Sequence, residues 1–124
     1  MAITIKKKPV QQVTLFSGTR TASANGVADT GYAGVDAIIF QIAVTAASGT
    51  TPSLTTKIQD SIDGVNWNDL TTFTAATAAT NETKRVNAPF GDWIRSVSTI
   101  TGTIPSFTYS VVLQAEARAN DRQP

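Results

Sequence analysis

The segment from Asp60 to Asp69 concentrates carboxylate and amide oxygens, which are the ligands that calcium prefers. Its spacing does not match an EF-hand loop, because Gly64 follows Asp63 directly. The alternative is a tight turn, in which the Asp-Gly pair supplies the positive φ that a hairpin needs. In that case the Asn side chains would satisfy nearby backbone groups and Trp67 would pack inward.

Aromatic side chains offer a second kind of chemistry, the stacking of sugar rings on an exposed surface. The four candidates are Tyr32, Trp67, Trp93 and Tyr109. The alternative places Trp93 and Tyr109 inside the protein, because buried aromatic rings contribute strongly to packing. The sequence leaves both interpretations open.

Catalysis would have to depend on carboxylates or lysine, since the chain has no histidine and no cysteine. Those absences exclude disulfides, a Ser-His-Asp triad and a zinc site built from Cys and His. A carboxylate-based enzyme would need a cleft that holds two of Glu82, Asp92, Asp63 and Asp69 together. No two of these have a spacing that demands an acid and base pair, so we expect no enzyme, no cofactor and no metal.

Charge and hydropathy limit the partners. The net charge of +1 argues against strong binding of nucleic acid. Lys6, Lys7 and Lys8 form a small basic run that would suit an acidic protein surface at least as well. No apolar run is long enough for a membrane helix, and residues 1–8 do not resemble a signal peptide. We expect a protein that stays where it is made or leaves inside a larger assembly.

These groups must be positioned by β-strands, because apolar residues alternate at a period of two along most of the chain. No segment shows a helical stripe, and the abundant Thr, Val and Ile favour strands. Three inward-facing stripes are predicted at Ile38, Phe40, Ile42 and Val44, at Leu54, Thr56 and Ile58, and at Phe107, Tyr109, Val111 and Leu113.

One phrase occurs twice. Gly49-Thr50-Thr51-Pro52-Ser53-Leu54 is echoed by Gly102-Thr103-Ile104-Pro105-Ser106-Phe107, and each copy lies between two alternating runs. Gly and Pro mark turns. The repeat therefore predicts two long β-hairpins, one around each phrase, that face each other across one core.

The length suits one domain with a buried core. We predict an all-β fold, an antiparallel two-sheet β-sandwich that is jelly-roll-like, with about seven or eight strands and extended termini. The expected division is an N-terminal arm at 1–9, a sandwich domain at 10–117 and a C-terminal tail at 118–124.

Two stretches form a recognisable pattern. Residues 38–70 join a strand to the first Gly-Thr-x-Pro-Ser phrase, a second strand ending at Gln-Asp-Ser, and then Asp-Gly-Val-Asn-Trp-x-Asp-Leu. Residues 93–113 join a Trp-Ile-Arg strand to Gly-Thr-x-Pro-Ser-Phe-Thr-Tyr-Ser-Val. The pattern resembles the small β-sandwich structural proteins of tailed bacteriophage virions, which include capsid decoration (cement) proteins.

The resemblance implies a non-enzymatic protein of the virion, made in the host cytoplasm, that decorates or cements the outer capsid surface. Its implied partners are the major capsid protein and neighbouring copies of itself, as a dimer or trimer, and neither nucleic acid nor membrane. The termini are the expected contact residues: Ile3, Ile5, Lys6, Lys7, Lys8, Arg118 and Arg122. The alternative is a carbohydrate-binding module of a phage tail or baseplate that adheres to host glycans.

Overall fold

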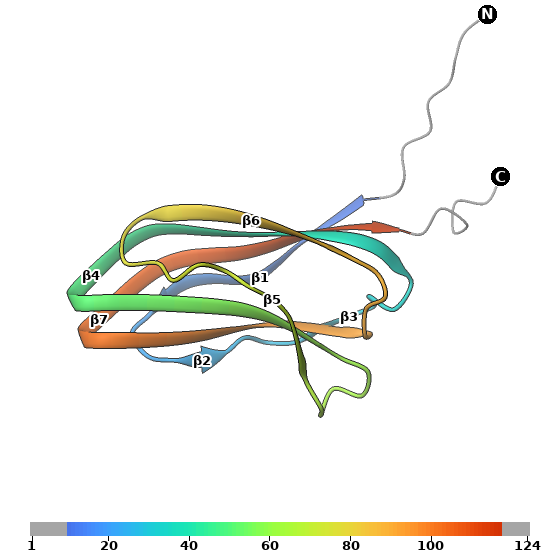
Figure 1. The fold of residues 1–124 in the computed structure, drawn as a ribbon, viewed down its shortest axis with the longest axis horizontal. Helices are drawn as coiled ribbons and strands as arrows, with labels where there is room; N and C mark the ends of the chain where they lie inside the picture. The colour runs from blue at the N-terminus through green and yellow to red at the C-terminus, as the bar shows by residue number, and fades with distance from the viewer. Residues whose placement is uncertain (1–9, 118–124) are drawn as a thin grey trace, which may run out of the picture.

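The protein is an antiparallel β-sandwich, seen in a computed structural model that describes residues 10–117 (Figure 1). It is built from strands β1 (Val10–Arg20), β2 (Ala24–Asn25), β3 (Asp29–Thr30), β4 (Val35–Ser61), β5 (Asn68–Thr72), β6 (Thr80–Asn87) and β7 (Trp93–Ala117). No helix that could span a membrane occurs among these residues. The predicted arm at 1–9 and tail at 118–124 lie outside the described residues.

The two layers come from two strands that each fold over in the middle, β4 and β7 (Figure 1). The first layer contains β6, residues 35–48 of β4, residues 106–117 of β7, and β1. The second contains β5, residues 53–61 of β4, residues 93–101 of β7, and the short strands β2 and β3. This arrangement is a jelly roll, which confirms the predicted fold class.

The prediction of a β-hairpin around each Gly-Thr-x-Pro-Ser phrase is wrong. The halves of β4 do not pair with each other; each half pairs with one half of β7, in a ladder that runs from Val35 opposite Ala117 to Ser61 opposite Trp93. The halves of β7 likewise lie in different layers. A turn signal between two alternating runs fits a bent strand as well as a hairpin, so only the pairing partners distinguish them.

The repeated phrase forms the corner where both strands fold. Thr50 lies opposite Thr103, and the register shifts on both sides of this pair. Gly49 faces the Ile-Pro pair of the second phrase, and Gly102 faces the Thr-Pro pair of the first. Each phrase therefore supplies one β-bulge and one glycine that makes room for the other bulge. Bulges bend a strand locally, and two reciprocal bulges bend both strands together.

The corner has no space for a side chain at either glycine. A Cβ on Gly49 would lie 2.7 Å from the Ile104 carbonyl oxygen, and one on Gly102 would lie 2.9 Å from the Thr51 carbonyl oxygen. Both glycines have positive φ, at 113° and 118°. Thr51 and Ile104 also have positive φ, at 47° and 50°, which is rare for β-branched residues and strains the backbone.

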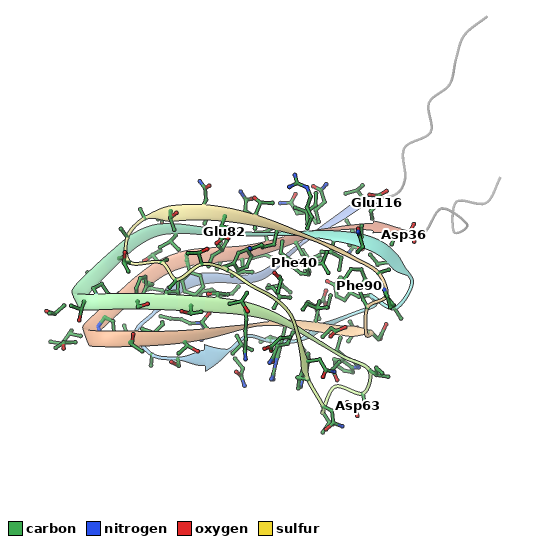
Figure 2. The ribbon with its side chains drawn as sticks, viewed as in Figure 1. Asp36, Phe40, Asp63, Glu82, Phe90 and Glu116 are labelled. Atoms are coloured by element: carbon green, nitrogen blue, oxygen red, sulfur yellow. The ribbon has the colours of Figure 1, made fainter. Side chains whose placement is uncertain are left out.

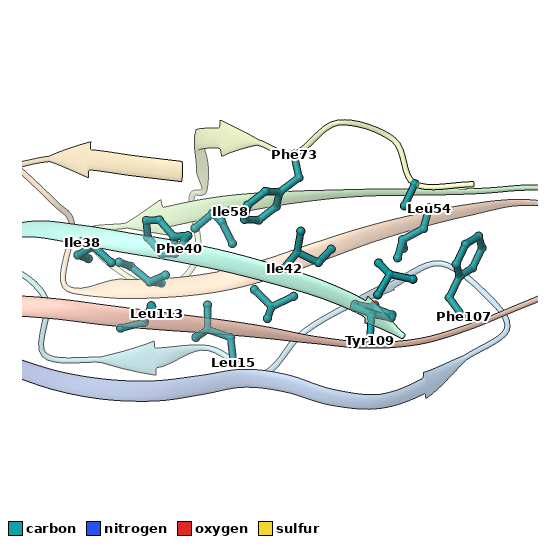
Figure 3. Close-up of a cluster of buried hydrophobic side chains, with 14 of the residues drawn as sticks. Leu15, Ile38, Phe40, Ile42, Leu54, Ile58, Phe73, Phe107, Tyr109 and Leu113 are labelled. Atoms are coloured by element: carbon teal, nitrogen blue, oxygen red, sulfur yellow. The ribbon is translucent and has the colours of Figure 1, made fainter. Parts of the chain in front are cut away.

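The core lies between the layers, and the three predicted inward stripes are confirmed (Figure 3). Phe40, Phe73 and Phe107 are its largest fully buried side chains. The core also contains polar groups. The Tyr109 hydroxyl, from the first layer, donates to Ser98 Oγ of the second at 2.7 Å, and Ser98 Oγ lies 3.2 Å from Thr56 Oγ1. Buried hydroxyl groups need hydrogen-bond partners, and these three satisfy one another. Their hydrogen bonds therefore connect the two layers.

The close approach at the corner can be tested with Gly49→Ala. We expect the free energy of unfolding to fall by about 2–4 kcal/mol, because the variant adds strain at positive φ and overpacks against backbone. Gly31→Ala is the matched control, since Gly31 has a φ of 105° but nothing within 4 Å of its added Cβ. Urea denaturation of both variants measures the difference. Equal losses would contradict the account of the corner.

Candidate functional site

The predicted contact residues of the termini lie outside the described residues: Ile3, Ile5, Lys6, Lys7, Lys8, Arg118 and Arg122. The structure does place the points where these segments join the domain. Val10 lies opposite Glu116 on neighbouring strands of the first layer. Both chain ends therefore join the sandwich at the end opposite the corner, which we call the loop end (Figure 1).

The oxygen-rich segment forms the β4–β5 turn, and its carboxylate is bound by the turn itself. Asp63 accepts hydrogen bonds from the backbone N–H groups of Val65 and Asn66, both at 2.9 Å. It also accepts from Asn66 Nδ2 at 2.8 Å and from Ser61 Oγ at 3.0 Å. The backbone bonds from Asn66 and Val65, followed by those from the side chains, hold the pKa of Asp63 well below its usual range.

This geometry matches the turn interpretation of the segment. Gly64 has a φ of 77°, as the Asp-Gly pair predicted, and Ser61 Oγ accepts from its N–H at 2.8 Å. Among residues 10–117, no group of three or more His, Cys, Asp or Glu side chains is arranged to hold a metal ion. The oxygens of Asp63 accept hydrogen bonds from backbone and side-chain groups of the turn itself, which is the common use of Asp in a turn.

The four aromatic candidates do not form one exposed platform. Tyr109 is buried in the core, and Tyr32 is buried with its hydroxyl donating to Asp29. Burial, followed by that hydrogen bond, raises the pKa of Tyr32. The half-buried Trp67 has the Arg95 guanidinium 4.1 Å from the centre of its ring. The ring of the half-buried Trp93 lies against Gly64.

The outer face of the second layer carries a connected polar network. Arg95 on β7 donates to Gln59 Oε1 through Nε at 3.0 Å and Nη2 at 2.9 Å. Gln59 on β4 then donates to Asp69 on β5 at 2.8 Å, and Lys57 lies 3.3 Å from the same carboxylate. The bond from Gln59, followed by Lys57, lowers the pKa of Asp69. The network holds three strands and leaves these groups satisfied.

The carboxylates considered for catalysis lie in separate local networks. Glu82 accepts from the Thr74 N–H at 2.7 Å and pairs with Lys84, and these contacts outweigh its burial so that its pKa is lowered. Asp92 accepts from the Ala33 N–H at 3.4 Å. Figure 2 shows Glu82 on the side of β6 and Asp63 in the distant β4–β5 turn. Glu82 and Asp63 therefore lie in different parts of the fold.

Three shallow clefts are lined by residues within 10–117, and each is lined by at most one carboxylate. The largest of these three, about 260 Å³, lies at the loop end between the β4–β5 turn and the β6–β7 connection. A cleft of about 60 Å³ lies beside Tyr32. A third of about 90 Å³ lies on the outer face of the first layer. All three are smaller than a pocket for a drug-sized ligand.

The centre of the outer face of the first layer carries uncharged side chains, and Arg85 and Glu116 lie on the same face to either side of it. Strands β1, β4 and β7 contribute its centre, which contains Gln12, Thr14, Gln41, Ala43, Ser110, Val112 and Gln114. We call this set the uncharged face. It differs from the outer face of the second layer, where charged groups from three strands form the network around Gln59.

No family model matches the chain, and no curated protein sequence matches it either. Solved structures do match its fold. The SPBc2 prophage-derived protein YomS aligns with a TM-score of 0.56 and 11% identity, over 91% of this chain and 99% of YomS. The PBSX exported protein XepA aligns with a TM-score of 0.60 and 12% identity, over 92% of this chain.

A viral protein has the same fold. The VP2 subviral particle of infectious bursal disease virus aligns with a TM-score of 0.58 and 12% identity, over 91% of this chain. This chain spans 41% of XepA and 33% of VP2, so it matches one part of each of those proteins. At these identities the likeness establishes the fold.

The network around Gln59 was not predicted from the sequence. Alternation does place Lys57 and Gln59 on the outward side of their strand, which was the available signal. The pairing of Gln59 with Arg95 spans 36 positions, however, and depends on the register between β4 and β7. The corner sets that register. Because the sequence predicts two hairpins in place of the corner, it does not predict which residues of β4 and β7 are paired.

The β4–β5 turn should show its dependence on Asp63 under acid conditions. The folded pKa is depressed, so the hydrogen bonds are fully present above the unfolded pKa of about 3.9 and are lost as pH falls through the lower folded pKa. As the pH is lowered, we expect the NMR chemical shifts of the Val65 and Asn66 amide protons to change only below the unfolded pKa of about 3.9. The Asp63→Asn variant should not show this pH-dependent change in the amide shifts. If the midpoint of the change in the unmodified protein lies at or above about pH 3.9, the hydrogen bonds do not lower the pKa of Asp63 and the account of the turn is contradicted.

Proposed function

We propose that this chain is a non-enzymatic structural protein of a bacteriophage virion that decorates or cements the outer surface of the capsid. The observation that carries the proposal is the complete jelly roll, shared with a prophage-derived protein of matching length and with a viral particle protein. The carboxylates considered for catalysis support a non-enzymatic role, because Asp63, Asp69 and Glu82 each lie in a separate local network of hydrogen bonds.

The uncharged face is the surface that we assign to the capsid. Its seven residues carry no charge, so a partner that covers these residues alone removes no charged group from water. Burying an unpaired charge is the largest cost that such a contact could meet. Gln41, Val112 and Gln114 lie at its centre, on paired strands of one sheet. A broad sheet face suits contact with another protein surface better than it suits a small ligand.

The proposed partners are the major capsid protein and neighbouring copies of this chain, in a dimer or trimer. The proposed location is the capsid surface of the virion, after synthesis in the host cytoplasm. The terminal segments would add contacts between neighbours through Ile3, Ile5, Lys6, Lys7, Lys8, Arg118 and Arg122. Repetition over a capsid lattice would let modest single contacts sum to stable attachment.

Binding to purified capsid shells tests this function. We expect saturable binding to shells that lack the protein, and greater resistance of the decorated shells to heat and to chelators. Gln41→Lys combined with Gln114→Lys should weaken binding by about tenfold or more, since each places a charge at the centre of the contact. Thr99→Lys is the matched control, because Thr99 is exposed on a strand of the second layer.

Two results would contradict the proposal. One is a folded protein that fails to bind shells at concentrations well above those in a virion. The other is unchanged binding by the double lysine variant, which would move the contact away from the uncharged face. A glycan array on the same protein examines the carbohydrate alternative, and a signal lost in a folded Trp67→Ala variant would replace the capsid proposal.

A further inference from the structure

The cleft at the loop end combines an apolar floor with a fixed carboxylate. Phe90 is buried beneath it, with 7% of its surface exposed, and Pro89 and Ile62 line its sides. The Asp60 carboxylate also lines the cleft and is held by the Gly91 N–H at 2.8 Å. A volume of about 260 Å³ suits one or two aliphatic side chains better than a larger ligand.

The β4–β5 turn beside this cleft carries two solvent-exposed apolar side chains. Ile62 is 86% exposed and Val65 is 75% exposed, although the turn that carries them is ordered by the hydrogen bonds of Asp63. An ordered turn that holds two large apolar side chains in water is typical of a contact surface. The occupant should therefore contribute apolar groups of its own.

The charge around the cleft is negative. Asp60 lines the cleft, Asp63 lies in the adjoining β4–β5 turn, and Asp92 directly follows the lining residue Gly91 in the sequence. Of the cations nearest along the chain, Arg95 is bound to Gln59 and Trp67 on the outer face of the second layer. Arg85 is exposed on β6, opposite Ile39 and outside the lining of the cleft. The occupant should therefore also carry positive charge.

The chain itself contains a segment of this chemistry. Five of its ten Lys and Arg residues, but one of its nine Asp and Glu residues, lie in residues 1–9 and 118–124. Residues 10–117 consequently carry five basic and eight acidic side chains, a net charge of −3. Within residues 1–9, Ile3 and Ile5 precede Lys6, Lys7 and Lys8. Residues 118–124 offer no large aliphatic side chain, which favours the N-terminal segment as the occupant.

The position of the first described residue is compatible with such a contact. Val10 lies at the loop end of the first layer, the same end that carries Phe90 and the β4–β5 turn (Figure 2). Ile3 precedes it by seven residues, and an extended chain of that length reaches about 25 Å. Four strands are only about 15 Å across. The segment is long enough to reach the cleft of its own domain or that of an adjoining copy.

We propose that residues 2–8 of this chain dock in the cleft at the loop end. Ile3 and Ile5 enter beside Phe90 and Ile62, and the three lysines lie against Asp60, Asp63 and Asp92. This inference deepens the proposed function by giving the N-terminal segment a partner surface on the protein itself. Its test needs no capsid, so its failure is distinguishable from a failure of shell binding.

Disulfide trapping in the full chain tests the contact, since the natural sequence has no cysteine. Thr4→Cys leaves both isoleucines in place, and Asn68→Cys lies in the lining of the cleft. We expect this pair to form a disulfide at least about tenfold faster than a pair of Thr4→Cys with Thr101→Cys, because docking raises the effective concentration. Thr101 is exposed at the corner end and serves as the control.

Non-reducing gels then distinguish a bridge within one chain from a bridge between two copies, and either result supports docking of the segment. Reversing the charge with Lys6→Glu, Lys7→Glu and Lys8→Glu should return the rate to that of the control, as should Ile3→Ser with Ile5→Ser. These variants lie outside the sandwich domain and leave its core unchanged. Equal rates for the two cysteine pairs, or rates that neither variant lowers, would overturn the proposal.

Discussion

Two neighbouring antiparallel strands can fold over together only if both bend at the same point of their shared ladder. In this protein the requirement is met by Gly49 and Gly102, each of which accepts the bulge of the other strand at a distance that excludes a Cβ. The strain at Thr51 and Ile104 is confined to this corner. Because the central ladder of both sheets passes through it, the corner sets the register from which the layers, the core and the surface networks follow.

The same constraint makes the two ends of the sandwich different. At the corner end β4 and β7 cross between the layers as continuous strands, with the β1–β2 and β5–β6 connections beside them (Figure 1). The loop end collects the β4–β5 turn, the β6–β7 connection and the points where both terminal segments join. Loops on a rigid scaffold are the usual place for recognition. The exposed Ile62 and Val65, the cleft above Phe90 and its surrounding carboxylates all lie at this end.

Local patterns in the sequence predicted much of this structure. Alternation at a period of two identified the buried faces of β4 and of residues 107–113 in β7, since side chains on a strand point to opposite sides in turn. The Asp63-Gly64 pair identified the β4–β5 turn, because its requirement for positive φ is local. The fold class followed from these features together with the absence of any helical stripe. The missing His and Cys limited the chemistry, and that limit needed no structure.

Pairing between distant segments could not be predicted in this way. The Gly-Thr-x-Pro-Ser phrase specifies where a strand turns, but whether the two halves pair with each other depends on competition with another strand 53 positions away. The network of Gln59, Arg95 and Asp69 and the hydrogen bond from Tyr109 to Ser98 depend on the same long-range register. Composition and alternation thus determined which residues face the core, because those preferences are local. The layers and the surface sites were decided by strand pairing, which is a property of the whole chain.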